Sequence, residues 1–403
     1  MQILVGDEHI NCTPVRPYDD GVCDLLDAWS QEIRGMREAR EYPDVMTFAF
    51  FIRRGSVVKK KNDFLSSHGG RSYRLGRGLA FHIAPSNVPV NCMYTLVFGL
   101  LSGCANIVRV PSKEFPQVDI LCRALSNVLK KHKFSEHAER IQVLRYDRDE
   151  KNLSGMGMTE FFSSICDVRV IWGGDATVES VRRFPIGTRA KEITFPDRYS
   201  FGIIDAQSVR EASDDELREL ARGFYNDTYL MDQNACSSPH LIVWSEKNHE
   251  AAAITEAQDR FWEAVAAEAE KYDLADIKVS DKYADVCELA GNVASVKKYH
   301  GNLVYVCDVD ELGSDPVEKL RGRYGTFFQY VIKDIDKVIP VMDNKKVQTC
   351  AVYGIDPGEV KDLVIEKGLE GVDRVVPFGK TLDIDVFWDG YDLIGEMSRV
   401  VSL

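Results

Sequence analysis

The chain has 403 residues, 45% of them hydrophobic and 28% charged, with a formal net charge of −13. This length accommodates two domains that each bury a core, and the acidic balance argues against nucleic-acid binding, which needs a basic face. No apolar run reaches the roughly 18 residues of a membrane span, and residues 1–8 do not read as a secretory signal. The ten cysteines show no metal-ligand spacing, so we expect reduced thiols, a cytoplasmic chain and no bound metal.

The first half alternates short apolar runs with helical segments, the pattern of βα units and a mainly parallel sheet. Strands are predicted at Leu79–Ala84, Ile107–Val110, Ile141–Leu144, Val168–Trp172 and Ile193–Phe195. Helices are predicted at Val90–Ser102, at Phe115–Lys131 and after Gly173-Gly174. The order strand, glycine or proline turn, helix therefore occurs three times.

A second set of elements begins near Ser200. Helices are predicted at Asp214–Tyr225, His249–Tyr272 and Pro357–Lys367, and strands at His240–Trp244, Leu303–Cys307, Phe327–Ile332 and Thr349–Tyr353. The boundary near residue 200 is a change of pattern and not of composition. A tandem pair of domains and a domain inserted into the first one therefore both remain open.

Four segments carry residues suited to chemistry, and the first is Pro85-Ser86-Asn87-Val88-Pro89, at the end of a predicted strand. Ligands in open α/β sheets bind outside the carboxyl ends of strands. Two prolines restrict the backbone there, so the Asn87 amide is a fixed donor for a developing oxyanion. The alternative is an asparagine that merely turns the chain.

The second segment follows the next strand and contains Arg109, Ser112 and Lys113. In Rossmann-like folds the residues after a second parallel strand contact the adenosine ribose of a dinucleotide. An acid there pairs with a free 2′-hydroxyl, whereas a cation favours a 2′-phosphate. The alternative is that Lys113 and Glu114 form an ordinary solvated first turn of a helix.

The third segment is Gly173-Gly174-Asp175, after another apolar strand. Glycines allow a ligand close to the backbone, and a following helix N-terminus favours a pyrophosphate. This is not the GxGxxG pattern, and a tight turn explains the two glycines equally well.

The fourth segment is Asp232-Gln233-Asn234-Ala235-Cys236, just before a new element. A cysteine at a helix N-terminus would have a lowered pKa and be partly thiolate. No histidine is close by in sequence, which disfavours a Cys-His hydrolase. Taken alone, this segment is explained as well by an inert buried thiol.

In this order the four segments resemble the aldehyde dehydrogenase superfamily, and more closely its acyl-CoA reductase (LuxC-like) branch. Pro85–Pro89 resembles the oxyanion segment Pro-x-Asn-x-Pro, and residues 232–236 resemble the nucleophile segment Gly-Gln-x-x-Cys. Residues 322–330 and 386–392 are similar to the reductase branch specifically. The resemblance implies an α/β fold with a Rossmann-type cofactor domain over residues 1–200, to which 377–403 return, and a second α/β catalytic domain over 201–376.

The resemblance also implies a reaction, namely NADPH-dependent reduction of an acyl thioester to an aldehyde. Cys236 would form the thioacyl intermediate, Asn87 and the Cys236 N–H would hold the oxyanion, and coenzyme A would be the co-product. Cofactor contacts would come from the first three segments, at Pro85, Ser86, Arg109, Ser112, Lys113, Gly173, Gly174 and Asp175. Val110 stands where the family has its ribose-binding lysine, and Lys113 stands where it has the acid that binds the 2′-hydroxyl, which favours NADPH over NADH.

Aldehyde-oxidising members carry a glutamate that activates water, and residues 194–200 contain none. This difference favours a reductase, which needs no activated water. The group that moves protons stays open, with Asp232, His240 and His82 as candidates. The resemblance implies a homodimer or homotetramer, and an acyl-transferring enzyme is a further expected partner.

Three other functions remain open. An acyl-phosphate reductase of the same superfamily would keep the fold and change the acyl donor. A cysteine acyltransferase or acyl-binding protein would use Cys236 without hydride transfer. A non-catalytic dinucleotide-binding protein would leave that cysteine inert.

Overall fold

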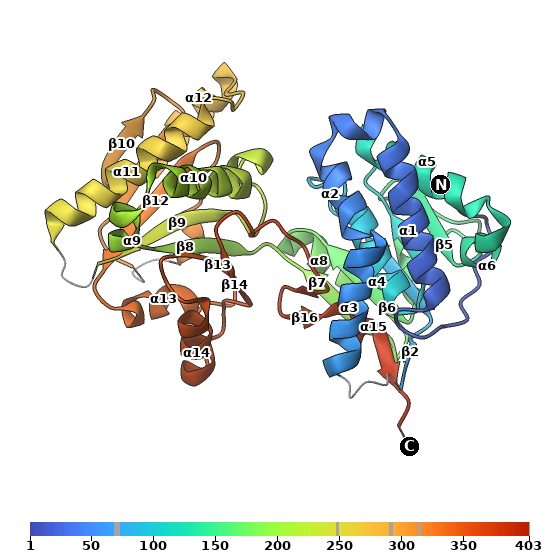
Figure 1. Ribbon diagram of the computed structural model, residues 1–403. Helices are drawn as coiled ribbons and strands as arrows, with labels where there is room; N and C mark the ends of the chain where they lie inside the picture. Colours follow the sequence, from blue (N-terminus) through green and yellow to red (C-terminus); the bar gives the residue numbers. More distant parts are fainter. Residues whose placement is uncertain (68–72, 247–249, 290–292, 313–315, 403) are drawn as a thin grey trace. The chain divides into compact units, whose positions relative to one another are not determined.

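The computed structural model describes residues 1–67, 73–246, 250–289, 293–312 and 316–402. Internal contacts divide the chain into two units, the first formed by Met1–Pro196 with Tyr391–Leu403 and the second by Asp197–Gly390. Each unit contains its own sheet with helices on both faces (Figure 1). None of the helices in the described part of the chain combines the length and apolar character that crossing a membrane requires.

The first unit is built on a six-stranded sheet in the order β1-β5-β4-β3-β6-β7. Its strands are β1 (Gln2–Val5), β3 (Leu79–Ile83), β4 (Ala105–Arg109), β5 (Ile141–Arg145), β6 (Val168–Trp172) and β7 (Lys191–Phe195). All neighbours pair in parallel except β1, which is antiparallel to β5 at the edge. Every residue of β3 and β6 is buried, as expected for central parallel strands covered on both faces.

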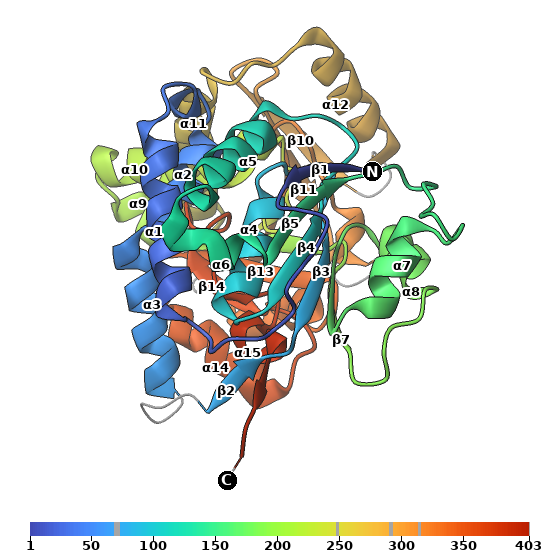
Figure 2. The same cartoon turned by 90° about the vertical axis from the view of Figure 1, so that its right-hand side faces the viewer.

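Helices cover both faces of this sheet, with α1, α4 and α5 on one side and α7 and α8 on the other (Figure 2). The helices are α1 (Asp20–Gly35), α2 (Pro43–Phe51), α3 (Arg54–Ser67), α4 (Asn91–Leu101), α5 (Pro116–Leu129), α6 (Ser135–Ala138), α7 (Met158–Ile165), α8 (Asp175–Arg182) and α15 (Leu393–Met397). The alternation of side chains along β3 sends Phe81 toward Phe162 of α7 and His82 toward Thr95 of α4. A short pair, β2 (Arg74–Gly76) and β17 (Ser398–Val400), brings the C-terminal residues beside residues 74–76.

The second unit is built on a seven-stranded sheet in the order β10-β11-β12-β9-β8-β13-β14. Its strands are β8 (Tyr199–Asp205), β9 (Pro239–Ser245), β10 (Val293–Tyr299), β11 (Val304–Val309), β12 (Thr326–Ile332), β13 (Val347–Tyr353) and β14 (Arg374–Pro377). Only β10, an edge strand, is antiparallel to its neighbour. The short strands β15 (Phe387–Trp388) and β16 (Tyr391–Asp392) pair where the chain leaves this unit.

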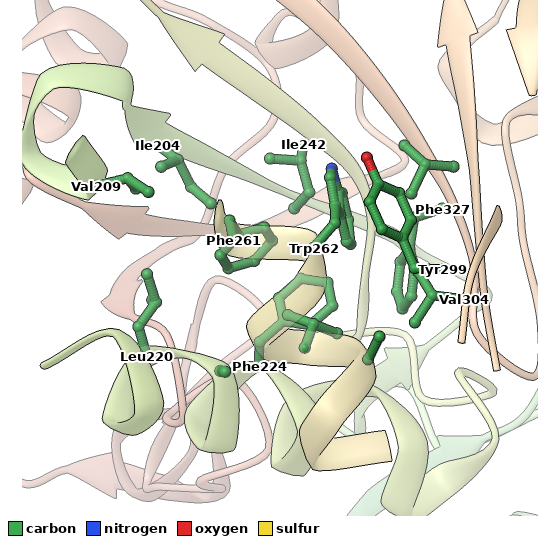
Figure 3. Close-up of a cluster of buried hydrophobic side chains, with 14 of the residues drawn as sticks. Ile204, Val209, Leu220, Phe224, Ile242, Phe261, Trp262, Tyr299, Val304 and Phe327 are labelled. Atoms are coloured by element: carbon green, nitrogen blue, oxygen red, sulfur yellow. The ribbon is translucent and has the colours of Figure 1, made fainter. Parts of the chain in front are cut away.

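The helices of this unit are α9 (Ala206–Glu211), α10 (Asp214–Thr228), α11 (Ala251–Ala269), α12 (Asp276–Leu289), α13 (Ile339–Met342) and α14 (Pro357–Lys367). α10 begins with a capping box in which Ser213 and Glu216 satisfy each other's backbone N–H groups. The face under α10 and α11 is packed with aromatic side chains, including Phe224, Trp262 and Phe327 (Figure 3). A second cluster, mainly aliphatic, fills the opposite face under α14.

The predicted elements are found in both units. The strand predicted at Val168–Trp172 and the helix predicted at Pro357–Lys367 have the same bounds in the structure, and the ends of the other predicted elements shift by at most three residues. One predicted helix start, His249, lies outside the described residues. The elements that were not predicted are the helices α1, α2, α3, α6, α7, α9, α12, α13 and α15 and the strands β1, β2, β8, β10 and β14 to β17.

Candidate active site

Two of the predicted segments meet at the topological switch point of the first sheet. The chain proceeds from β3 to β4 and β5 on one side and then crosses to β6 on the other side of β3. Ligands of doubly wound sheets bind outside the carboxyl ends of the strands at such a point. Pro85-Ser86-Asn87 follows β3 and Gly173-Gly174-Asp175 follows β6, so the two segments are brought together at the position expected for a nucleotide.

Of the β3 segment, Pro85 is half-buried whereas Ser86 and Asn87 are exposed. The backbone leaves the sheet gradually, because the Ala84 N–H still donates to the Arg109 carbonyl at 3.0 Å. Asn87 thus lies just past a strand end, in the segment that joins β3 to α4.

Cations gather at the carboxyl ends of β4 and β5. Arg109 lies over the Tyr146 ring, 5.3 Å from its centroid, and its buried Nε has no hydrogen-bond partner in the described chain. Lys113 is exposed, with its ammonium 5.0 Å from the centre of the Phe115 ring, and Ser112 beside it is exposed as well. These groups offer positive charge and a hydroxyl to an anion.

The two glycines after β6 have different surroundings. A Cβ on Gly173 would meet Thr177 Cγ2 at 2.9 Å, so packing against the first turn of α8 explains that glycine. Around Gly174 nothing lies within 4 Å of the Cβ position, and no side chain caps the helix that begins after it. The exposed Asp175 is the first residue of α8. Gly174 is therefore the better of the two for close approach of a ligand to the backbone.

Cys236 belongs to the second unit and lies in a turn directly before β9. Asp232 and Gln233 at the start of this turn have left-handed backbone, with φ of 52° and 60°. The element that follows is the strand predicted at His240–Trp244, so Cys236 does not stand at a helix N-terminus. Burial raises the pKa of the Cys236 thiol, and the charge of Asp197 raises it further.

Charged groups surround the half-buried thiol. Cys236 Sγ donates to Asp197 Oδ1 at 4.0 Å, and Arg321 Nη1 donates to the same oxygen at 3.0 Å. The backbone N–H of Arg198 and the charge of Arg321 lower the pKa of Cys236, while Asp389 raises it. Burial outweighs the groups that favour the thiolate.

The cysteine turn is attached to the starts of two neighbouring strands. Ser200 Oγ, near the start of β8, donates to the Cys236 carbonyl at 2.7 Å. The Gln233 amide accepts from the N–H groups of Gly325 and Thr326 at 2.7 and 3.2 Å and donates to the Thr326 carbonyl at 3.0 Å. Hydrogen bonds thus connect the amino ends of β8, β9 and β12 around the thiol.

The three proton-transfer candidates from the sequence have structural partners instead. Burial lowers the pKa of His82 to about 4, and its ring bonds Thr95 and Asn106. Burial and Arg321 lower the pKa of His240 to about 3, and its ring stacks on Tyr199. Asp232 accepts hydrogen bonds from Tyr272 and Lys278.

Asp197 and Arg321 were not assigned a role from the sequence. They stand 124 residues apart, and nothing in either local pattern indicates that they meet. Arg321 precedes the predicted strand Phe327–Ile332, whereas Asp197 precedes β8, a strand that the sequence did not predict. Within the described ranges, no group of acidic, histidine and cysteine side chains is arranged to hold a metal ion.

Solved structures with a similar fold are aldehyde dehydrogenases. A 1-pyrroline-5-carboxylate dehydrogenase variant of Thermus thermophilus matches with a TM-score of 0.60 and 12% identity, over 95% of this chain and 81% of that one. A benzaldehyde dehydrogenase of Corynebacterium glutamicum matches with a TM-score of 0.58 and 13% identity, over 94% of this chain and 84% of that one. Betaine aldehyde dehydrogenase of Staphylococcus aureus matches with a TM-score of 0.56 and 14% identity, over 88% of this chain and 74% of that one. The chain therefore has the aldehyde dehydrogenase fold, which confirms the predicted fold class.

Within that class, the family model described as acyl-CoA reductase (LuxC) matches residues 60–400. The chain belongs to the acyl-CoA reductase (LuxC) family, as its motifs predicted. A long-chain acyl-protein thioester reductase of Vibrio harveyi is 23% identical over 332 residues, or 81% of this chain. The chain spans 63% of the length of that relative.

Proposed function

We propose that this chain reduces an acyl thioester to an aldehyde with NADPH, through a thioacyl bond to Cys236. The observation that carries the proposal is the Cys236 thiol, hydrogen-bonded to a carboxylate and close to a guanidinium, in a member of the acyl-CoA reductase family. A cysteine in such surroundings is suited to nucleophilic attack on an activated carbonyl. The second unit, which carries this cysteine, is accordingly proposed as the catalytic domain.

In the acyl-transfer half of the reaction, Cys236 Sγ bonds to the acyl carbon and the thiol of the donor leaves. The Asn87 amide and the Cys236 N–H are proposed as donors to the intervening oxyanion, whose stabilisation is a large term in acyl transfer. Since residues 194–200 contain no glutamate, water is not activated by the group that aldehyde oxidisers use. The thioacyl bond is proposed to be reduced and not hydrolysed.

The first unit is proposed to bind the cofactor at its switch point. Pro85, Ser86, Gly173, Gly174 and Asp175 would line the site between β3 and β6, and the uncapped first turn of α8 suits a pyrophosphate. Arg109, Ser112 and Lys113 would hold the 2′-phosphate, and the unpartnered Arg109 Nε fits an anionic ligand. When bound, NADPH supplies the hydride that converts the thioacyl carbon into an aldehyde.

The donor is proposed to be acyl-CoA or an acyl group on a protein thiol, with the free thiol as co-product. The Vibrio harveyi relative is named for a protein-bound thioester, which supports an acyl-transferring partner enzyme. All ten cysteines are free thiols, which supports a cytoplasmic location because thiols stay reduced there. A homodimer or homotetramer is proposed from the family resemblance alone.

Two measurements test the proposal. Mixing the protein with acyl-CoA and NADPH is expected to consume NADPH and release aldehyde. With NADPH withheld, radiolabelled acyl-CoA is expected to leave label on Cys236. The label should be absent from Cys236→Ala and present on Cys287→Ala, which removes an exposed thiol of the same unit.

No NADPH consumption with short, medium and long acyl chains would contradict the thioester reaction. Consumption with acyl phosphates alone would favour an acyl-phosphate reductase. Label without saturable NADPH binding would favour an acyltransferase, and neither label nor alkylation of Cys236 would favour a non-catalytic protein.

A further inference from the structure

We infer that Asp197 is the proton carrier of acyl transfer at Cys236, and that Arg321 positions its carboxylate for this role. The inference rests on the proposed function, because it concerns the same thiol. Asp197 lies directly before β8, Arg321 in the loop before β12 and Cys236 directly before β9. Parallel pairing of these neighbouring strands brings their amino ends, and with them the three side chains, together.

The Cys236 thiol and the Asp197 carboxylate are hydrogen-bonded in the structure. Cys236 Sγ donates to Asp197 Oδ1 at 4.0 Å, the long distance expected of a weak sulfur donor. Arg321 is held at both ends of its guanidinium, with Nη1 on Asp197 Oδ1 and Nη2 on the Arg198 carbonyl, each at 3.0 Å. Because two hydrogen bonds fix the Arg321 guanidinium, the Asp197 carboxylate that it binds is fixed as well.

The thiol requires a proton acceptor. Burial keeps the Cys236 pKa above its ordinary value, with Asp197 and Asp389 raising it and the Arg198 N–H and Arg321 lowering it. The thiol form therefore predominates near neutral pH. Because the thiolate is the nucleophile, a base within reach of the sulfur has a function to perform.

Among the other titratable groups near this site, Lys346 Nζ donates to the Asp197 carbonyl at 3.3 Å, and Asp389 and His240 are bound or packed elsewhere. Asp389 Oδ1 accepts from Arg198 at 2.8 Å and from Gln348 at 2.9 Å, and its side chain is 2% exposed. His240 is fully buried, stacked on Tyr199 and neutral. Asp197, in contrast, has 47% of its side chain exposed, so its proton can exchange with water.

The proton balance of the step is simple. Asp197 accepts the thiol proton as the bond between Sγ and the acyl carbon forms. It returns that proton to the donor's sulfur when the bond between that sulfur and the acyl carbon breaks, giving free thiol. No proton is gained or lost overall, and the carboxylate is restored for the second half of the reaction.

The test compares two reactions of Cys236 in Asp197→Asn. The first is single-turnover acylation by acyl-CoA without cofactor, which we expect to slow by about 10²-fold, a typical contribution of a positioned acid or base. The second is alkylation of Cys236 by iodoacetamide from pH 6 to 10, followed on the peptide that contains it. Its midpoint should move to lower pH, since the charge of Asp197 raises the thiol pKa.

A purely structural role would slow both reactions, whereas a proton carrier slows only acylation. Asp362→Asn, which removes an exposed carboxylate of α14 in the same unit, should change neither reaction. In Asp197→Ala, added formate should restore part of the acylation rate, which keeps the inference testable if the asparagine variant folds poorly.

Acylation of Asp197→Asn at the wild-type rate or faster, or the absence of formate rescue, would overturn the inference while leaving the proposed function intact. Failure of the wild-type protein to take up label at Cys236 would instead contradict the proposed function, and the inference with it.

Discussion

Charge is distributed unevenly among the side chains after β4, and this decides which of them is available to a cofactor. Glu114 accepts a hydrogen bond from Arg145 at 3.1 Å, so the nearest acid is already paired. Lys113 forms no ion pair within the described residues and lies over the Phe115 ring. A dinucleotide with a 2′-phosphate would find a cation at this strand end and no unpaired acid beside it.

We therefore predict that Lys113→Ala raises the KM for NADPH by about tenfold, the loss of one charge-assisted hydrogen bond, and leaves the KM for NADH nearly unchanged. Steady-state kinetics with both cofactors measures the difference. Lys130→Ala, which removes an exposed lysine at the end of α5, should alter neither constant. An equal rise for both cofactors would show that Lys113 does not contact the 2′-phosphate.

Side-chain hydrogen bonds, and not regular secondary structure, hold the turn that carries Cys236. The Gln233 amide makes three hydrogen bonds to Gly325 and Thr326, and Ser238 Oγ donates to the Asp227 carbonyl on α10 at 2.7 Å. Asp227 in turn accepts from the N–H groups of Gly379 and Thr381. The cysteine turn is thus linked, directly or through Asp227, to three other segments of the same unit.

Gln233→Met should leave the buried Gly325 N–H and the Thr326 carbonyl without this partner, while the Thr326 N–H keeps its bond to the Arg323 carbonyl at 3.2 Å. We predict a loss of about 2–4 kcal/mol in the free energy of unfolding, because each unsatisfied buried group costs roughly 1–3 kcal/mol. Urea unfolding followed by tryptophan fluorescence measures it, since Trp244 and Trp262 lie in the core of this unit.

The matched control is Gln207→Met, at an exposed glutamine of α9, which should stay within about 0.5 kcal/mol of the wild type. Comparable stabilities of the two variants would mean that the cysteine turn does not depend on the Gln233 bonds.

At the scale of the whole molecule, each unit buries an uncharged histidine in its own sheet. The pKa of His82 in the first unit is lowered to about 4 and that of His240 in the second to about 3, mainly by burial. An unfolded histidine binds its proton near pH 6.5. Between pH 6.5 and 4 the unfolded chain therefore holds more protons, and the free energy of unfolding falls as the pH falls.

Asp227 acts in the opposite direction, because burial raises its pKa to about 7 and the folded state binds its proton first on acidification. A differential measurement separates the two effects. We predict that the wild type loses about 3 kcal/mol more stability than His82→Gln between pH 7 and 4, because burial lowers the His82 pKa from 6.5 to about 4 in the folded state. Chemical denaturation at several pH values measures this, and parallel curves for the two proteins would contradict a neutral buried His82.

Much of the fold could be predicted from local patterns. Parallel strands covered on both faces read as short apolar runs between turns, which is why Val168–Trp172 and His240–Trp244 were recognised. The N-terminal helices α1 to α3 were not, since two of them have weakly amphipathic sequences and no strand alternates with them. The candidate nucleophile and the strand-end segments were recognised by their order along the chain.

By itself, the sequence determined the α/β class, the strand ends that carry Asn87 and Lys113, and Cys236 as the candidate nucleophile, because each depends on residues adjacent in the chain. Tertiary structure alone decided the strand order that places β6 beside β3 and the meeting of Asp197, Arg321 and Cys236. Pairing between strands joins residues more than 100 positions apart, and no local pattern encodes which strand ends become neighbours. Burial, which raises the thiol pKa, is likewise a property of the folded unit.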